Sequence, residues 1–370
     1  MSQHDAPAGA LVAAPSTTSR DRFGVLSRST LLRHTLFALI GFGLYYGLVQ
    51  ISSDIWNSAY ITPTAYYVCA AAGLTLLVGV SGQISLGHGA FMMVGAYTTA
   101  LVLQHWHAPN HGNLQLIPVL FIAAAVSAVF GLVVGLAGAR LRGPYLAGAT
   151  LALAVGLPQV TEYHSLTTKL GGNQGLIVST PSPPSGFDLY RWQSLIAGIA
   201  AIVILWFLAN VMRSRLGRSM RAVRDDEVSA ALAGLSVPRV QVLTFVISAA
   251  CAGVGGALLA LVKLVAGPGA FDLALSLGLL AAIVFGGLGS LAGAVYGSIV
   301  VVLLPQWSQD FANAVHIHSG KVTNNLPLLV YGVVLALAML VFPSGLQGAV
   351  LRLRAVIMAQ VTRRQRSRAG

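Results

Sequence analysis

Charged residues are scarce in this sequence. Asp, Glu, Lys and Arg make up only 9% of its 370 residues, against about 25% in a typical soluble domain. None of them occurs between positions 55 and 139. About 20 consecutive apolar residues cross a bilayer as a helix, so this interval has room for several crossings. The scarcity excludes an ordinary soluble fold and predicts an all-α, polytopic integral membrane bundle.

Cysteine is also rare, and apolar and polar residues do not alternate. Cys69 and Cys251 both lie in apolar runs, where a lone cysteine is most often a small buried hydrophobe. Neither a disulfide nor a metal site is expected from them. Runs such as 121–139 lack the alternation that a transmembrane β-barrel requires.

The basic residues are grouped, although the net charge is +12. Most of them fall in four clusters: Arg20 to Arg33, Arg140 with Arg142, Arg213 to Arg239, and Arg352 to Arg368. Positive residues concentrate in the cytoplasmic loops of membrane proteins. The grouping therefore predicts cytoplasmic clusters and cytoplasmic termini, and it argues against nucleic acid as a partner.

Apolar runs bounded by charged or turn residues predict about ten transmembrane segments. The domains expected are a disordered tail (1–33), a transmembrane domain (34–343) and a basic tail (344–370). The predicted spans are 34–51, 64–80, 88–104, 114–139, 143–163, 192–212, 240–263, 273–287, 290–304 and 326–343. Pairing 64–104 and 273–304 as re-entrant segments would give the same sidedness, so both topologies stay open.

Two glycine-rich stretches interrupt this apolar sequence. The first is "GVSGQISLGHGAF" (79–91) and the second is "GGLGS" (286–290). Residues 273–304 would measure about 48 Å as one helix, more than the roughly 30 Å of a hydrocarbon core. Two short helices broken at 286–290 suit this length better. Paired glycine-interrupted segments are a recognised pointer to the binding region of a transporter.

Catalytic and metal-binding motifs are hard to find. A nucleotide-binding P-loop is absent, because "HSGKVTN" (318–324) lacks its first glycine and the Ser or Thr after the lysine. The histidines of "HWHAPNH" (105–111) could in principle bind Zn or Cu, but an ordinary polar loop is the simpler interpretation. We expect no catalytic residue, no metal and no cofactor in this chain.

The longest strongly charged stretch is an arginine-rich loop, defined here as residues 213–239. Good helix formers predict a helix over 219–233, which Gly234 and Pro238 close. On a helical wheel, a broad arc holds Met220, Val223, Val228, Ala231 and Leu232. From composition, docking to a partner and a loop that only sets topology are equally good interpretations.

Several of these segments resemble the LivM-type permeases, the membrane subunits of ATP-binding-cassette importers for branched-chain amino acids. The specific matches are the GQ-x-SLGHG motif within 73–100 and the GR-x-x-RA-x-R motif within 217–235. Supporting matches are "LRGPYLAGATLAL" (141–153), "LGGNQGL" (170–176) and "FGGLGSLAGAVYG" (285–297). The resemblance covers roughly residues 60–340.

The resemblance implies a multi-pass protein of the bacterial inner membrane that works by alternating access. Its expected partners are a second homologous permease subunit, two ABC ATPase subunits that bind ATP and Mg, an extracytoplasmic solute-binding protein, and membrane lipid. The ATPase-coupling residues that it implies are Gly217, Arg218, Arg221, Arg224, Asp225, Asp226, Glu227, Ala230 and Gly234. The translocation-path residues are Gly82, Gln83, Ser85, Gly87, His88, Gly89, Gly286, Gly287 and Gly289.

Two departures from the family bear on the solute. Acidic residues are frequent in these permeases where this chain has "LAVGLPQV" (153–160) and Gly278. Their loss leaves a more apolar interior. Urea, short amides or another small polar solute stay possible beside branched-chain amino acids, and a self-sufficient channel or secondary carrier is the alternative of a different class.

Overall fold

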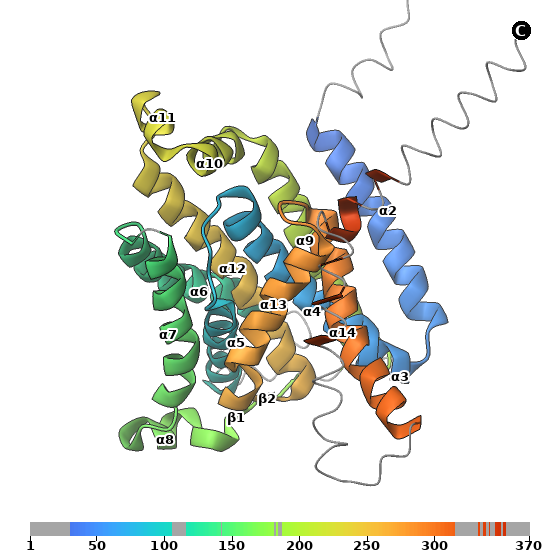
Figure 1. Ribbon diagram of the computed structural model, residues 1–370. Helices are drawn as coiled ribbons and strands as arrows, with labels where there is room; N and C mark the ends of the chain where they lie inside the picture. The colour runs from blue at the N-terminus through green and yellow to red at the C-terminus, as the bar shows by residue number, and fades with distance from the viewer. Residues whose placement is uncertain are drawn as a thin grey trace, which may run out of the picture.

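The computed structural model of this chain describes residues 30–105, 116–141, 143–180, 183, 187–314 and short stretches between 332 and 352. Within them the chain is a helical bundle (Figure 1). The longer helices are α2 (Thr30–Ile51), α4 (Thr62–Leu74), α5 (His88–His105), α6 (Leu116–Gly138), α7 (Pro144–Val160), α9 (Leu189–Arg213), α10 (Arg215–Asp225), α12 (Val237–Lys263), α13 (Leu273–Gly286) and α14 (Leu291–Ala314).

Shorter elements join these helices. They are α3 (Asp54–Trp56), the π-helices η1 (Asn57–Ile61) and η2 (Thr75–Val80), α8 (His164–Leu170), α11 (Glu227–Leu232), and the 3-10 turns η4 (Gly172–Gln174) and η5 (Pro268–Ala270). Strands β1 (Leu176–Ile177) and β2 (Val265–Ala266) pair antiparallel, with Leu176 opposite Ala266. This small sheet was not expected from the apolar runs.

The predicted polytopic helical architecture is confirmed. In the described part of the chain, six helical stretches are long and apolar enough to cross a membrane, and α7 and residues 291–307 of α14 form shorter apolar helices. Nine of the ten predicted spans coincide with helices. The tenth, 326–343, lies almost entirely outside the described residues, so the count of ten stays a prediction. The predicted tails also lie almost entirely outside them.

Three boundaries differ from those expected. The helix predicted to start at 64 starts at Asp54, because the Ser53 hydroxyl caps the amide of Trp56 at 3.4 Å. The helix predicted over 290–304 continues through Pro305 to Ala314. Residues 273–304 therefore hold one short helix and the start of a long one, and not two short helices.

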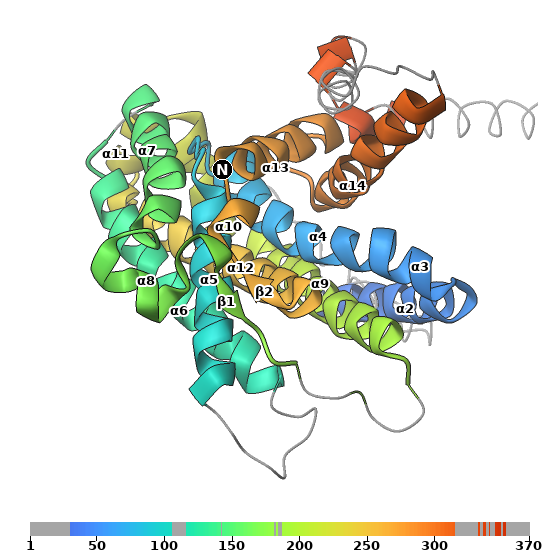
Figure 2. The ribbon, with the colours of Figure 1, turned by 90° about the horizontal axis from the view of Figure 1, so that it is seen from below.

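Helix α12 forms the centre of the bundle, where it packs against α4, α5 and α6 (Figure 2). Glycines bring these backbones into direct contact. A Cβ built on Gly256 would lie 1.8 Å from the carbonyl oxygen of Met92 in α5, and one on Gly95 would lie 2.1 Å from that of Gly253. Small residues at helix interfaces have this role in membranes, where apolar burial alone does not drive helices together.

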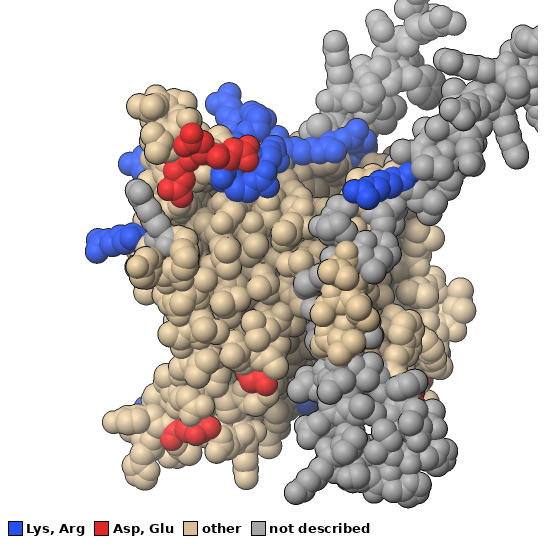
Figure 3. Space-filling view, viewed as in Figure 1, with Lys and Arg blue, Asp and Glu red and all other residues tan. Residues whose placement is uncertain are grey.

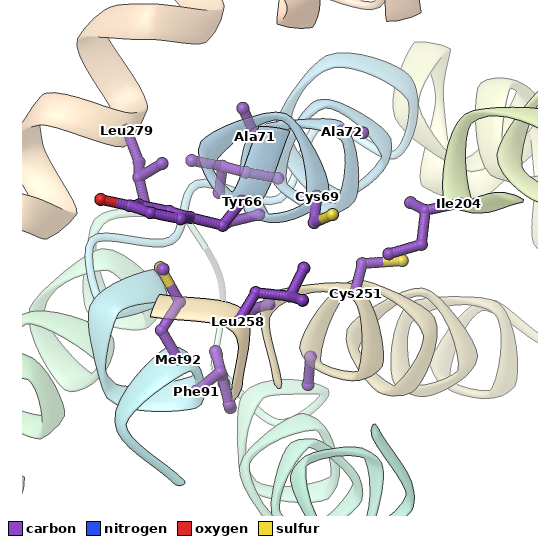
Figure 4. Close-up of a cluster of buried hydrophobic side chains, with 14 of the residues drawn as sticks. Tyr66, Cys69, Ala71, Ala72, Phe91, Met92, Ile204, Cys251, Leu258 and Leu279 are labelled. Carbon is purple, nitrogen blue, oxygen red and sulfur yellow. The ribbon is translucent and has the colours of Figure 1, made fainter. Parts of the chain in front are cut away.

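A buried apolar cluster continues this contact between α4, α5 and α12. Figure 4 shows Tyr66 and Cys69 of α4 beside Met92 of α5 and Cys251 and Leu258 of α12. Both cysteines are buried. The cluster packs α4 and α5 against α12, and the polar loop between them buries the side chains of Ser81, Gln83 and Ser85 while Ile84 stays exposed.

Charged side chains gather at one end of the bundle. Figure 3 shows blue and red residues over α10 and α11, above a broad uncharged surface. At the opposite end, where α3 and α9 begin, Arg191 Nε donates to Asp54 Oδ1 at 3.1 Å. Two charged ends around an uncharged belt fit a protein that spans a bilayer.

We expect Gly256→Ala to destabilise the bundle, because the added methyl group would collide with the α5 backbone. Overpacking of this kind costs about 1–3 kcal/mol or more. The measurement is the thermal unfolding temperature of the detergent-solubilised protein. Gly148→Ala on α7 is the matched control, since a Cβ there meets nothing within 4 Å. Equal unfolding temperatures for the two variants would contradict the proposed backbone contact.

Candidate functional site

The first glycine-rich stretch is non-helical between η2 and α5. We define residues 81–87 as the first break. Its backbone amides find partners within the protein: Ser81 donates to Leu76 and Gln83 donates to Leu77, both at 3.1 Å. The amide of Leu86 donates to Thr150 Oγ1 of α7 at 2.9 Å. Thus the chain leaves the helix without leaving these groups unpaired.

The lower end of the first break packs closely against α7 and α13. A Cβ on Gly87 would lie 2.4 Å from the carbonyl oxygen of Thr150, and one on Gly89 would lie 2.7 Å from Ser276 Oγ. The Gly89 amide donates to that Ser276 hydroxyl at 3.0 Å. The glycines are required here because two neighbouring elements occupy the space of a side chain.

Three polar side chains of this region are buried. Gln83, Ser85 and His88 expose 7%, 0% and 0% of their surface. His88 Nε2 donates to the carbonyl oxygen of Ala70 at 3.1 Å, while His88 Nδ1 and Ser85 Oγ have no hydrogen-bond partner. Unpaired buried polar atoms are costly and uncommon, and the described residues hold three others elsewhere, Asn57 Oδ1, Tyr97 OH and Trp192 Nε1.

The second break comprises residues 287–290, between α13 and α14. Gly287 and Gly289 have φ angles of +119° and +81°, which side chains rarely adopt. A Cβ on Gly286 would lie 1.8 Å from the carbonyl oxygen of Gly293. The chain therefore turns sharply, and the two helices it joins start almost in contact.

The second break meets the end of η2, just before the first break, although the two segments are some 200 residues apart in sequence. A Cβ on Gly79, at the end of η2, would lie only 2.2 Å from the amide nitrogen of Gly289. In return, a Cβ on Gly289 would lie 3.2 Å from the carbonyl oxygen of Gly79. We call this backbone contact the glycine crossing. It joins the α4 side of the bundle to the α13–α14 pair.

The arginine-rich loop holds two helices, α10 and α11, and the single predicted helix over 219–233 is wrong. Asp226 has extended backbone (φ −159°) and caps α11 by accepting from the amides of Val228 and Ser229. The hydrogen bond from the Ser229 hydroxyl, together with these amides, lowers the pKa of the Asp226 carboxyl. Asp226 and Ser229 favour a helix start over a continuous helix. Gly234, with φ +85°, ends the second helix.

The apolar residues of the loop do not share one face, contrary to the helical wheel. Met220 and Val223 of α10 are buried against the membrane helices. Val228 and Leu232 of α11 are 68% and 85% exposed. Because the chain turns at Asp226, α10 packs inward while α11 presents apolar side chains outward, among charged neighbours (Figure 3).

Arg224 connects this loop to the glycine crossing. Its Nη1 donates to the carbonyl oxygen of Gly79 at 2.8 Å. Its Nε and Nη2 donate to Asp225 Oδ1 at 3.2 and 3.1 Å. The Arg224 side chain also lies against Gly82, where a Cβ would lie 2.6 Å from Arg224 Cγ.

A second connection runs through Gln241 near the start of α12. Gln241 Nε2 donates to Glu227 Oε1 of α11 at 2.9 Å. Gln83 Nε2 donates to the backbone carbonyl of Gln241 at 3.4 Å and to Ser81 Oγ at 2.7 Å. The arginine-rich loop thus contacts the first break directly, where Arg224 lies against Gly82, and is also joined to it through Gln241.

Comparison with known proteins identifies the chain. Residues 58–342 match the family described as the permease component of the branched-chain amino acid transport system. The chain belongs to this family. It is therefore a multi-pass permease of the bacterial inner membrane.

Three relatives illustrate the match. The chain is 30% identical to LivM of Escherichia coli K12, a high-affinity branched-chain amino acid permease, over 77% of this chain and 68% of LivM. It is 29% identical to the corresponding BraD of Pseudomonas aeruginosa, over 68% and 84%. It is also 29% identical to the fructose import permease FruG of Bifidobacterium longum, over 73% and 78%. No solved structure matches the chain significantly.

The permease structure brings part of the predicted site together. Gly82 and Gln83 lie beside Arg224 and Glu227, and Gly289 lies beside the end of η2. Gly87, His88 and Gly89 lie deeper, at the start of α5, and Gly286 and Gly287 form the turn into α14. Gly217 packs on α9, where a Cβ would lie 2.4 Å from the Met212 carbonyl oxygen. Arg218, Arg221 and Ala230 contact their own loop or its neighbours.

Sequence reasoning missed four residues of this region: Gly79, Thr150, Gln241 and Ser276. Each is a small or polar residue inside an apolar helix, and such residues were the available signal. Two surface hollows lie elsewhere, one between α9 and α12 and one between α2 and α9. Of the histidine loop, His105 ends α5, while 106–111 lie outside the described residues.

We expect Gly79→Ala to abolish transport by the assembled permease, because the new methyl group would force the glycine crossing apart. Uptake of labelled leucine in proteoliposomes is the measurement, and the amount of permease in the membrane is quantified alongside. Gly156→Ala, where a Cβ meets nothing within 4 Å, is the matched control. Uptake at the wild-type rate in Gly79→Ala would show that the crossing is dispensable.

Proposed function

We propose that this chain is the non-catalytic permease subunit of an ATP-binding-cassette importer for branched-chain amino acids. The observation that carries the proposal is the arginine-rich loop, in which α11 presents Val228 and Leu232 outward at the charged end of the bundle. Exposed apolar groups beside charged ones suit docking into a cleft of a partner protein. The family membership makes an ATPase the partner of choice.

The energy for transport comes from this partner in the proposed mechanism. Among the described residues, the buried polar side chains include no Asp, Glu, Lys or Arg. A carrier driven by protons or sodium ions would often place such groups in its interior. Two ATPase subunits that close on ATP and Mg would instead displace the arginine-rich loop, and the loop would pass the displacement to the breaks.

The first break is the proposed wall of the solute path. Non-helical backbone is tolerated at membrane depth only where it is buried in protein or lines a water-filled cavity. Ser85 Oγ and His88 Nδ1, which lack partners here, are available to a solute when the surrounding helices separate. Selectivity would rest mainly with an extracytoplasmic solute-binding protein that delivers the solute.

The remaining partners and the orientation follow from the same proposal. A second, homologous permease subunit completes the path, and lipid covers the uncharged belt (Figure 3). The end that carries α10 and α11 faces the cytoplasm, with both termini, in agreement with the position of the arginine clusters. Arg191 and Asp54 then lie at the outer side.

A second candidate solute is a small polar molecule without charge. FruG, which is a fructose import permease, is as similar to this chain in percentage identity as BraD. The interior described here has hydroxyl, amide and imidazole groups, which suit neutral hydrogen-bonding solutes such as sugars, urea or short amides.

We expect the purified chain alone to show no ATPase activity, and the complete transporter to take up labelled leucine only with ATP. Uptake is compared for leucine, fructose and urea, because the three probes separate the candidate solutes. A transporter with a P-loop lysine variant in its ATPases is the matched control. Solute flux through the chain alone, without ATP, would favour a channel or secondary carrier instead.

A further inference from the structure

The glycine crossing lies directly beneath the arginine-rich loop. One side of the crossing is Gly79, at the end of η2, and the other side is Gly289, in the second break. Gly79 and Gly289 contact each other through backbone atoms, and no side chain lies between them. A displacement of Gly79 must therefore either move the second break with it or separate the two segments.

We propose that Arg224 and Gln241 are positioning residues that transmit the movement of the arginine-rich loop to the glycine crossing. The inference rests on the proposed function, and it names the atoms of this chain through which coupling passes. Arg224 holds the Gly79 carbonyl, and Gln241 holds Glu227 on one side and Gln83 on the other.

The Arg224 contact suits this role because of where the acceptor lies. The amides that follow in the chain bypass Gly79: Ser81 donates to Leu76 and Gln83 donates to Leu77. The Gly79 carbonyl thus lies at the C-terminal end of a helix, where the unpaired carbonyl groups carry a partial negative charge that attracts a cation. A hydrogen bond from a guanidinium is stronger than one between neutral groups.

The Arg224 side chain is held in place at its guanidinium group and along its carbon stem. Asp225 fixes its Nε and Nη2 from within the loop, and its carbon stem rests on Gly82. Gly82 has φ +75°, so it could accept a side chain only with strain. When α10 moves, the arginine therefore pulls on Gly79 and presses on Gly82 together.

The Gln241 contact adds a second, independent attachment. Gln241 lies near the start of α12, the central helix of the bundle. Its side chain donates a hydrogen bond to Glu227, the first residue of α11. Because its backbone carbonyl accepts from Gln83, rotation of α11 changes the position of the first break relative to a rigid helix.

The test measures ATP hydrolysed per leucine imported by the complete transporter in proteoliposomes. In Arg224→Met, which keeps an apolar stem and loses every donor, we expect this ratio to rise roughly tenfold or more, since a hydrogen bond to a charged group is lost. Arg224→Lys keeps one charged donor and is expected to restore part of the coupling. Co-purification of the ATPase subunits verifies that each variant assembles.

Arg140→Met is the matched control. Arg140 is an exposed arginine that follows α6 at the same end of the bundle, outside the arginine-rich loop. Gln241→Leu provides a second test of the same route, because it removes the bond to Glu227 without removing a charge. We expect a raised ratio for Gln241→Leu and the wild-type ratio for Arg140→Met.

The outcomes separate this inference from the proposed function. If the wild-type complex neither binds ATPases nor takes up any of the three probes, the proposed function fails, and this inference fails with it. If the wild type is coupled while both Arg224→Met and Gln241→Leu keep its ratio, only the inference is overturned. An equal rise in Arg140→Met would also overturn it, because loss of positive charge would then explain the effect.

Discussion

A peptide group that leaves a helix inside a membrane must find its hydrogen-bond partners within the protein. This requirement governs both breaks of the permease. In the first break, carbonyl groups of η2 and the hydroxyl of Thr150 serve as acceptors. In the second, Gly287 donates back to Ile283 at 3.0 Å. The helices around the breaks are therefore arranged to supply these partners as well as to fill space.

The same requirement explains why glycine recurs at the breaks. Partners can reach a backbone group only when the neighbouring elements approach closely, and a side chain would hold them apart. At Gly87 the approach brings α7 to the first break, and at Gly79 it brings the second break. Two segments that each look like a local interruption thus form one structure. The arginine-rich loop lies where this structure can be reached from the charged end.

Nine of the ten spans and the positions of both breaks could be predicted from sequence, because hydropathy and glycine content are local properties. The glycine crossing could not, because it joins Gly79 to Gly289 through the packing of α4 beside α13 and α14. The division of the loop helix was missed for another reason. Residues 219–233 hold no Gly or Pro, so a continuous helix was expected, but Asp226 accepts hydrogen bonds from Val228 and Ser229 and starts a new helix.

The division of the loop has a mechanical consequence. A single helix over 219–233 would present one apolar face and could either bind a partner or pack on the bundle. With the turn at Asp226, α10 buries Met220 and Val223 in the bundle, while α11 keeps Val228 and Leu232 exposed. In the proposed function, partner binding falls to α11 and packing on the bundle to α10, and the two helices are joined by the N-cap residue Asp226. Arg224 and Glu227, on either side of that residue, bond the membrane part at Gly79 and Gln241. In the proposed coupling, a force applied to α11 would therefore reach the breaks through these short, directional contacts.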